Sequence, residues 1–166
     1  MNIRKKEKGF TIIEVVLVLA IAGLIFLMVF IALPALQRGQ RDAQRKNDLS
    51  RLNTAITSYQ SNNRGSLPTT WGSCTGTGAT LVCTGFLKDY VTVGSDSFVD
   101  PSGTNYVLVA NTVVPTIPNS FDATNPKVYI TTGAICNGET VTIGQSSRKI
   151  AIQMKLEGSG TACQSN

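Results

Sequence analysis

Histidine is absent from the 166 residues, and charged and aromatic side chains are scarce, at 15% and 7%. Without histidine, the chain lacks the usual general base near neutral pH, the partner of Ser-His and Cys-His nucleophiles and the commonest metal ligand. No convergent acid/base pair replaces it. These absences exclude most familiar enzyme mechanisms, so the sequence predicts a protein that is not an enzyme and uses no cofactor.

The net charge of +5 is carried by two short segments. Residues 1–9 and residues 37–51 each carry a side-chain charge of +3, while Glu14 subtracts one. Residues 52–166 hold six basic and six acidic side chains and are neutral. Binding to nucleic acid needs a local basic excess that neutralises phosphates. The sequence therefore gives no strong nucleic-acid signal.

Residues 15–36 form a run of 22 residues without a charge or a strongly polar side chain. About 20 apolar residues suffice to cross a bilayer as a helix. A cleaved secretory signal also begins with basic residues before an apolar stretch. The length of this run, Glu14 in its first turn and the lack of a following small-x-small cleavage site count against that alternative. We expect a single membrane span.

All four cysteines lie beyond residue 62, in a polar region rich in Gly and Thr. Their sequence separations are 9, 53 and 27, which do not fit the paired spacing of a zinc site. An even number of cysteines in such a region favours disulfides in an oxidising compartment. We therefore expect the N-terminus on the cytoplasmic side of the membrane and the distal part on the outer side. The cysteines are Cys74, Cys83, Cys136 and Cys163.

Beyond the apolar run, helix-favouring residues continue to about residue 62, with an apolar stripe on one face. This pattern predicts one helix over residues 10–62, whose second half is amphipathic. Pro34 should bend or loosen it, and Gly23 should weaken it locally. The basic residues 38, 41, 45 and 51 are expected to pair with Asp42 and Asp48 within the helix or between subunits, contributing little individually. The stripe consists of Leu49, Leu52, Ile56 and Tyr59.

Residues 63–166 are rich in Gly, Ser, Thr, Pro and Asn, with short β-branched runs. We predict strands over residues 105–110, 127–132 and 148–156. An antiparallel sheet of this size cannot bury enough surface alone, so its inner face should pack on the helix stripe. The fold class is therefore α+β, a long N-terminal helix on a small antiparallel sheet.

The residues that open the apolar run resemble a type IV prepilin. That family's pattern is a short basic leader ending in Gly, then Phe, apolar residues with a hydroxyl among them, and Glu as the fifth residue after the Gly. Gly9, Phe10, Thr11 and Glu14 match it. The specific resemblance covers roughly residues 5–36, and the expected helix, sheet and late cysteines extend it as a pilin-like architecture.

The resemblance implies that a prepilin peptidase removes leader residues 1–9 between Gly9 and Phe10 and that the new amine of Phe10 is methylated. It also implies that Glu14 pairs with the Phe10 amine of a neighbouring subunit during assembly on an inner-membrane platform. An ionised carboxylate in an apolar phase normally needs such a partner. The alternative is a Glu14 that reaches the cytoplasmic headgroups from the first helical turn.

The resemblance also implies expectations for three further features of the sequence. In filaments of this family the helix tends to melt between residues such as Gly23 and Pro34, although both are also common in membrane helices. Residues 100–106, Asp-Pro-Ser-Gly-Thr-Asn-Tyr, resemble a turn of many pilins and pseudopilins. Some pseudopilins bind calcium nearby, but three scattered carboxylates fall short of a calcium-loop signature. Those weak candidates are Asp96, Asp100 and Asp122.

The cysteines can form three connectivities. The most economical joins Cys74 to Cys83 and Cys136 to Cys163, and the second bond fits the C-terminal disulfide of many pilins. The entropy model assigns roughly 2.7 and 3.6 kcal/mol to closing loops of these lengths, as upper values.

Together these features predict a pilin subunit of a type IV pilus or pilus-like filament. Residues 1–9 are the leader, 10–36 the membrane-spanning and filament-core helix, 37–62 its amphipathic continuation, and 63–166 the globular region. Before assembly the chain sits in the cytoplasmic membrane, and afterwards in a cell-surface filament of identical or related pilin subunits. One alternative is a pseudopilin of a type II secretion or DNA-uptake machine, and another is an uncleaved, membrane-anchored surface adhesin.

Overall fold

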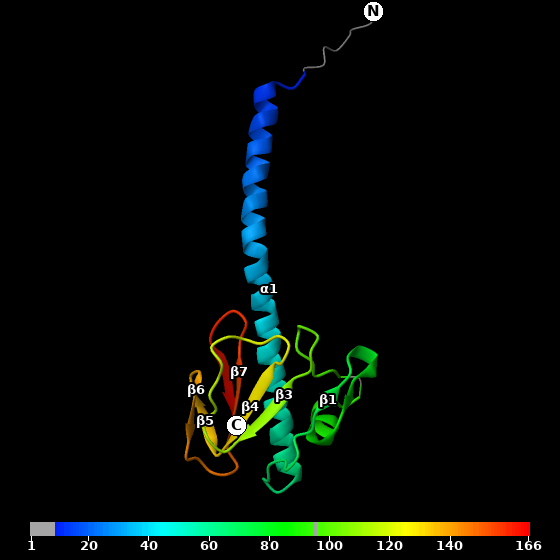
Figure 1. Cartoon of the computed structure of the whole chain (residues 1–166), viewed down its shortest axis with the longest axis vertical. Coiled ribbons are helices and arrows are strands. Elements are labelled where there is room, and N and C mark those ends of the chain that lie inside the picture. Colours follow the sequence, from blue (N-terminus) through cyan, green and yellow to red (C-terminus); the bar gives the residue numbers. More distant parts are fainter. Residues whose placement is uncertain (1–8, 95) are drawn as a thin grey trace, which may run out of the picture. The chain divides into compact units, whose positions relative to one another are not determined.

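The computed structural model describes residues 9–94 and 96–166. The chain divides into two compact units, residues 1–37 and residues 38–166, and the second is called the head. One long helix, α1 (Ile12–Asn62), contributes to both units (Figure 1). The expected leader residues 1–8 lie outside the described residues, so only its last residue, Gly9, has a described position.

Among the residues that the structure describes, none packs an apolar core around the first half of α1. All described side chains of residues 9–37 are exposed except Ala22, which is intermediate. The most apolar window of 18 residues has a mean hydropathy of 3.2, and α1 is unbroken across Gly23 and Pro34. This part of α1 is long and apolar enough to cross a bilayer, which suggests that it anchors the chain in a membrane.

The head contains a four-stranded sheet with the order β3-β4-β7-β8. The strands β4, β7 and β8 are antiparallel neighbours, whereas β3 pairs with β4 in parallel. The α+β class is confirmed, but the sheet is mixed, and the expectation of purely antiparallel pairing is wrong for β3. The strands are β3 (Val107–Asn111), β4 (Lys127–Thr132), β7 (Ile150–Lys155) and β8 (Thr161–Ser165).

The parallel pair follows from the length of the connection between β3 and β4. A tight hairpin forces antiparallel pairing, whereas a connection of a dozen or more residues permits a crossover. Residues 112–126 supply such a connection, and Val107 donates its backbone N–H to the Pro126 oxygen at 2.9 Å as the two strands begin. Strand composition does not encode this difference, because both directions bury the same apolar residues.

Two small hairpins complete the head. β1 (Cys74–Thr75) pairs with β2 (Val82–Cys83), and β5 (Ala134–Asn137) pairs with β6 (Thr140–Ile143). Short helical turns lie at Gly78–Thr80 (η1) and Leu87–Val91 (η2). The four strands of these hairpins and β8 were missed from sequence, since runs of two to five residues carry little periodicity.

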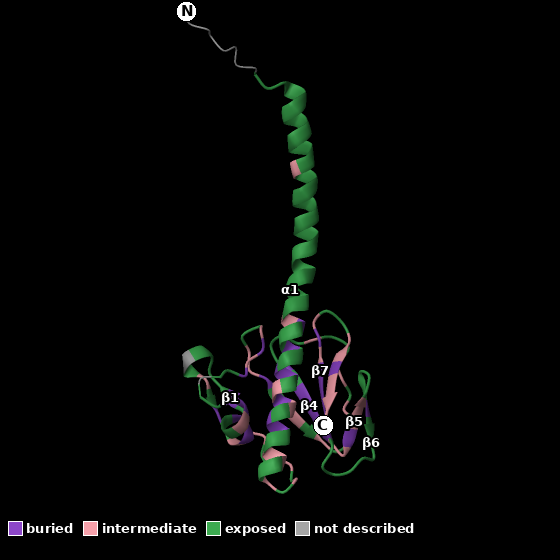
Figure 2. Ribbon diagram, turned by 180° about the vertical axis from the view of Figure 1, so that it is seen from behind, coloured by how far each residue is buried: buried purple, intermediate pink, exposed green. Residues whose placement is uncertain are grey.

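The main core lies between α1 and the sheet. From α1 it takes Leu49, Leu52 and Ile56 of the predicted stripe, with Tyr59 partly buried beside them. From β7 it takes the alternating residues Ile150, Ile152 and Met154, so the strand predicted over residues 148–156 does pack one face on the helix stripe. Figure 2 shows buried positions in purple on the head part of α1 and on the strands beside it.

The opposite face of β7 is also covered. Ala151 packs in a second, smaller cluster with Ala134 and Val141 of the β5–β6 hairpin. The amide nitrogen of Gln153 donates to the backbone oxygen of Glu139 at 2.8 Å in the turn of that hairpin. β7 is therefore the middle layer between α1 and the hairpin, which explains why five consecutive residues of β7 are buried.

Two disulfides fasten the hairpins. Cys74 bonds to Cys83 across the β1–β2 pair, and Cys136 of β5 bonds to Cys163 of β8. This is the economical connectivity among the three that the sequence allows. The second bond ties the outer hairpin to an edge strand of the main sheet.

Candidate functional site

The start of α1 coincides with the segment that resembles a prepilin. Gly9, Phe10 and Thr11 precede the helix, and the backbone oxygen of Thr11 accepts the N–H of Val15 at 3.3 Å. Thr11 is therefore the N-cap, the last residue outside the helix whose carbonyl already takes part in its hydrogen bonding. The scissile bond expected between Gly9 and Phe10 lies just upstream, outside regular secondary structure.

Thr11 and Glu14 bond to each other reciprocally. The Thr11 hydroxyl and backbone N–H each donate to Glu14 Oε2 at 2.8 Å, and the Glu14 N–H donates to the Thr11 Oγ1 at 3.3 Å. This is a capping box, in which the first and fourth residues satisfy donors that the helix cannot satisfy itself. The arrangement fixes both the first turn of the helix and the direction of the Glu14 carboxylate.

Sequence reasoning assigned Glu14 a role and left Thr11 without one. The signal was nonetheless present, because Thr-x-x-Glu immediately before an apolar run is the sequence signature of a capping box. Thr11 is also the only hydroxyl side chain between residues 9 and 36, and it lies three residues before Glu14.

Gly9 and Phe10 are both exposed in the part of the chain that the structure describes. The Phe10 side chain is 90% exposed, and an added Cβ at Gly9 would meet no heavy atom of the described residues within 4 Å. The same is true at Gly23, and Pro34 lies inside α1 without ending it. Gly9 is therefore not needed for packing within residues 9–94 and 96–166.

A second group of sequence-predicted residues gathers around Arg45, which is fully buried in the head. Its Nε and Nη2 donate to the two oxygens of Asp100 at 2.7 and 2.9 Å, a bidentate pair. Its Nη1 donates to Asp42 at 2.9 Å and to Glu157 at 3.2 Å. The guanidinium also lies 3.9 Å from the centre of the Phe121 ring. Four segments of the head therefore meet at this one side chain.

The ionisation of this group is set by opposing effects. Burial lowers the pKa of Arg45, but hydrogen bonds to Asp100, Asp42 and Glu157 outweigh it and raise that pKa above its usual range. Burial likewise raises the pKa of Asp100, yet the Arg45 hydrogen bond leaves it below its ordinary value. Arg45 and Asp100 are therefore a charged pair inside the head, and each is costly to leave alone.

The turn over residues 100–106 has both of its end residues fastened to α1. Asp100 bonds to Arg45, and the Tyr106 hydroxyl donates to Asp48 at 2.9 Å in a buried position. Between them, the Gly103 N–H donates to the Asp100 oxygen at 2.8 Å, which closes the predicted turn. Burial raises the pKa of Asp48, while the hydrogen bond from Tyr106 partly offsets this effect.

The three weak calcium candidates are not brought together. Asp100 is bonded to Arg45, Asp96 is 72% exposed and lies 3.6 Å from Arg51, and Asp122 accepts from its neighbour Thr124. No cluster of three or more potential metal-ligating side chains occurs within residues 9–94 and 96–166. These carboxylates instead form ion pairs with arginines or accept hydrogen bonds within turns.

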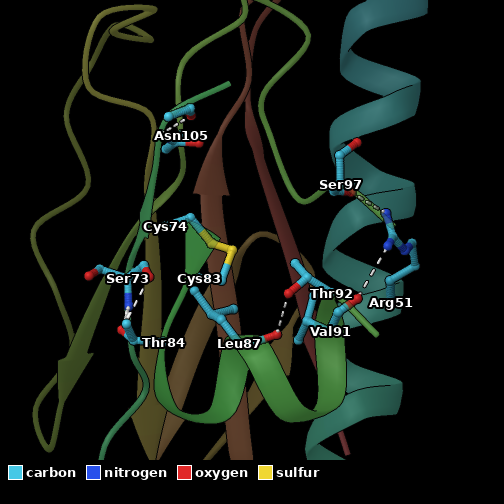
Figure 3. Close-up of a disulfide and its surroundings, with 11 residues drawn as sticks. Arg51, Ser73, Cys74, Cys83, Thr84, Leu87, Val91, Thr92, Ser97 and Asn105 are labelled. Atoms are coloured by element: carbon cyan, nitrogen blue, oxygen red, sulfur yellow. Dashed lines mark hydrogen bonds between the residues drawn. A yellow bond between two sulfur atoms is a disulfide. The ribbon is translucent and has the colours of Figure 1, made fainter. Parts of the chain in front are cut away.

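Arg51 holds the chain segment that follows the first disulfide. Its Nη1 donates to the Ser97 oxygen at 3.2 Å and its Nη2 to the Val91 oxygen at 3.5 Å, as Figure 3 shows beside the Cys74–Cys83 bond. The same side chain pairs with Asp48 one turn earlier on α1. Arg51 therefore links the helix to the loop without being buried itself.

Four aromatic side chains from the end of α1 and the loop that follows it form one group, in which Phe86 and Tyr90 are stacked and the other contacts are edge-to-face. Tyr59 contacts Phe86 and Tyr90, and Trp71 contacts Phe86, with ring centres 5.1 to 5.7 Å apart. Phe86 is buried and the other three are partly buried. These rings plug the space between the end of α1 and the loop, so they do not present a separate ligand-binding platform.

The ion pairs of the Glu157 carboxylate predict that the head becomes less stable in acid. A hydrogen bond from Arg41, with further contributions from Arg45, lowers the pKa of Glu157 from 4.5 to about 2. A folded-state pKa below the unfolded value stabilises the fold above pH 4.5, and this contribution is lost as the pH falls towards 2. We expect Glu157→Gln to flatten the loss of stability over that interval, measured as urea midpoints at several pH values.

The control for that measurement is Glu139→Gln, which removes a carboxylate that bonds the Thr161 N–H and lies outside the arginine group. It should leave most of the acid sensitivity in place. Equal pH slopes for wild type and Glu157→Gln would contradict the role assigned to Glu157. Part of the slope survives in either variant, because the pKa of Asp100 is also lowered.

Comparison with protein families gives a match at the N-terminus. Residues 4–30 match the family model of the prokaryotic N-terminal methylation motif. No curated protein and no solved structure matches the chain. The motif indicates a structural protein rather than an enzyme, and it implies processing by a prepilin peptidase and assembly with other pilin subunits. Residues 4–30 are thus a type IV prepilin-like class III signal segment, which supports a pilin-like or pseudopilin precursor.

Proposed function

We propose that this chain is the precursor of a structural subunit of a type IV pilus or pilus-like filament. The observation that carries the proposal is the coincidence of three boundaries within six residues: the Gly9–Phe10 pair, the Thr11 cap of α1 and Glu14 at the start of an uncharged run. Each is what an inserted, cleavable and polymerising helix requires. The match over residues 4–30 supports the same assignment.

In this proposal residues 1–9 are removed as a leader, and residues 10–36 span the membrane first and the filament core afterwards. Residues 37–62 carry the helix into the globular region, residues 63–166, which faces outward. Cleavage removes three of the five net positive charges, so the mature chain carries a side-chain charge of +2. The loss of leader charge also removes a barrier to extracting the N-terminus from the cytoplasmic face.

Glu14 is the proposed assembly residue within the apolar helix. Its carboxylate would pair with the Phe10 amine that cleavage creates on a neighbouring subunit, so that two charges neutralise each other in the filament core. Gly23 and Pro34 are the proposed points of helix flexibility, because Gly weakens a helix and Pro removes one internal hydrogen bond. The partners are then identical or related subunits and the inner-membrane assembly platform.

The decisive measurement is the intact mass and N-terminal sequence of the protein in filaments sheared from cells, compared with protein left in the membrane. We expect the filament form to begin at Phe10 and to be heavier by one methyl group, because the peptidase both cleaves and methylates its substrates. A chain that begins at Met1 and stays in the membrane would contradict the proposal and favour a permanently anchored surface adhesin.

A pseudopilin of a DNA-uptake machine is the second candidate, and one surface feature favours it. A groove of about 520 Å³ at the C-terminal end of α1 is lined by Arg148 and Lys149 together with Gln60 and Ser146, and by no acidic side chain. Basic side chains at this place also offset the helix dipole. Processed protein that retains duplex DNA and never appears in the sheared surface fraction would favour this candidate over a pilus subunit.

A further inference from the structure

The two oxygens of the Glu14 carboxylate differ in their hydrogen bonds. Both bonds that it accepts from Thr11 end on Oε2, at 2.8 Å each. Within the part of the chain that the structure describes, no hydrogen bond reaches Oε1. One oxygen is therefore tied to the residue's own helix, and the other is open on an exposed face of α1.

An unfastened glutamate in this position would have several rotamers of similar energy. A neighbouring subunit could then bind only the fraction of molecules whose Glu14 has the suitable rotamer. The apparent affinity would fall in proportion to that fraction. The Thr11 hydroxyl and N–H remove that freedom before any partner arrives. No other side chain between residues 9 and 36 carries a hydroxyl that could do so.

We propose that Thr11 is a positioning residue for subunit assembly: it fastens Oε2 of Glu14 to the helix start and thereby presents Oε1 to the Phe10 amine of a neighbouring subunit. The inference rests on the proposed filament function, which it deepens by naming the residue that orients the charge. Thr11 touches neither the incoming amine nor the processing enzyme in this role. Its effect on assembly passes through Glu14.

The test compares Thr11→Val with Thr11→Ser in the full chain, expressed in cells that make the filament. Valine keeps the shape of threonine and loses the hydroxyl, whereas serine keeps the hydroxyl and is a better N-cap. Two quantities are measured for each variant: the fraction of chain that begins at Phe10, and the ratio of filament to membrane protein among those processed chains.

We expect Thr11→Val to lower the filament-to-membrane ratio by roughly threefold to thirtyfold, the range that loss of an N-cap produces in an equilibrium. Thr11→Ser should stay within about twofold of wild type, because the same bonds can form. Processing should be normal in both. A Thr11→Ser variant that falls as far as Thr11→Val would overturn the inference, as would a Thr11→Val variant whose only defect is an uncleaved leader.

Glu14→Gln separates this inference from the proposed function. Glutamine also closes a capping box but carries no charge, so the proposed pairing predicts that it prevents assembly. Adding Thr11→Val to Glu14→Gln should then cause no further loss. Normal assembly of Thr11→Val alongside a failed Glu14→Gln would overturn the positioning role and leave the filament function standing. Normal assembly of Glu14→Gln would overturn the charge pairing itself, and the positioning role with it.

Discussion

Replacing Arg45 by methionine is expected to lower the free energy of unfolding of the head by about 3–5 kcal/mol. The side chain is fully buried, and Asp100 on the other side of the pair has no exposed side-chain surface. Methionine fills much of the same volume, so the loss reflects charge rather than a cavity. The carboxylates of Asp100 and Asp42 would remain in the interior without the cation that holds them.

Urea unfolding of the full chain in detergent, with both disulfides intact, measures this effect. The single tryptophan, Trp71, lies in the head and packs on Phe86, so its fluorescence reports on that unit. Arg41→Met is the matched control, because Arg41 pairs with Glu157 near the surface and its side chain is 34% exposed. It should lose no more than about 1 kcal/mol.

Removing the buried partner as well should recover part of the loss. In Arg45→Met combined with Asp100→Asn, the uncompensated charge at residue 100 is gone, and the amide can still accept the Ser102 N–H that Asp100 accepts at 2.9 Å. An Arg45→Met variant within about 1 kcal/mol of wild type would show that the buried network does not hold the head together.

The sequence predicts the head's helix and three of the four strands of the main sheet, β3, β4 and β7, because apolar periodicity and β-branched runs indicate burial. Ile150, Ile152 and Met154 alternate and do pack on the Leu49 and Leu52 face of α1. The direction of β3 could not be predicted in the same way, since pairing direction depends on the connection and not on which residues are apolar. The short β5–β6 hairpin leaves almost no periodic signal and depends on its disulfide and on β7 for its place.

The arginine group was predicted as pairs on the helix surface, and only part of that is right. Arg45 does pair with Asp42, and Arg51 with Asp48, each three residues apart. The burial of Arg45 was missed, because its main partner Asp100 is 55 residues away and Glu157 is 112 residues away. Spacing along a helix shows which side chains share a face, but it cannot show which distant loop will cover that face.

The turn at residues 100–106 shows the same division between local and distant information. Pro101 and Gly103 predicted a reversal of the chain, and the structure has one. That Asp100 and Tyr106 then reach Arg45 and Asp48 is a property of the packed head. A motif identified by resemblance thus acquires a physical reason: its end residues neutralise and satisfy buried polar groups of α1.

Replacing Gly9 by valine should reduce the processed fraction of the chain at least about tenfold, which corresponds to about 1.4 kcal/mol of lost transition-state binding at the peptidase. A β-branched side chain next to the scissile bond restricts the extended backbone that such an enzyme must accommodate, whereas glycine offers no obstruction. The measurement is the intact mass of membrane and filament protein, in which the uncleaved leader is retained.

This substitution should leave the described fold intact. An added Cβ at Gly9 meets no heavy atom of the described residues within 4 Å, and Gly9 precedes α1, so the hydrogen bonds of the helix are untouched. Gly39→Val is the matched control: the same change at an equally open position, inside α1 and far from the cleavage bond in sequence. It should be processed like wild type.

Gly9→Val chains that reach the filament and begin at Phe10 would show that the peptidase does not require glycine at residue 9. That result would contradict the proposal that cleavage depends on the missing side chain of Gly9. If Gly39→Val failed as well, the defect would lie in folding or insertion, because a processing enzyme acting at Gly9 has no contact with residue 39.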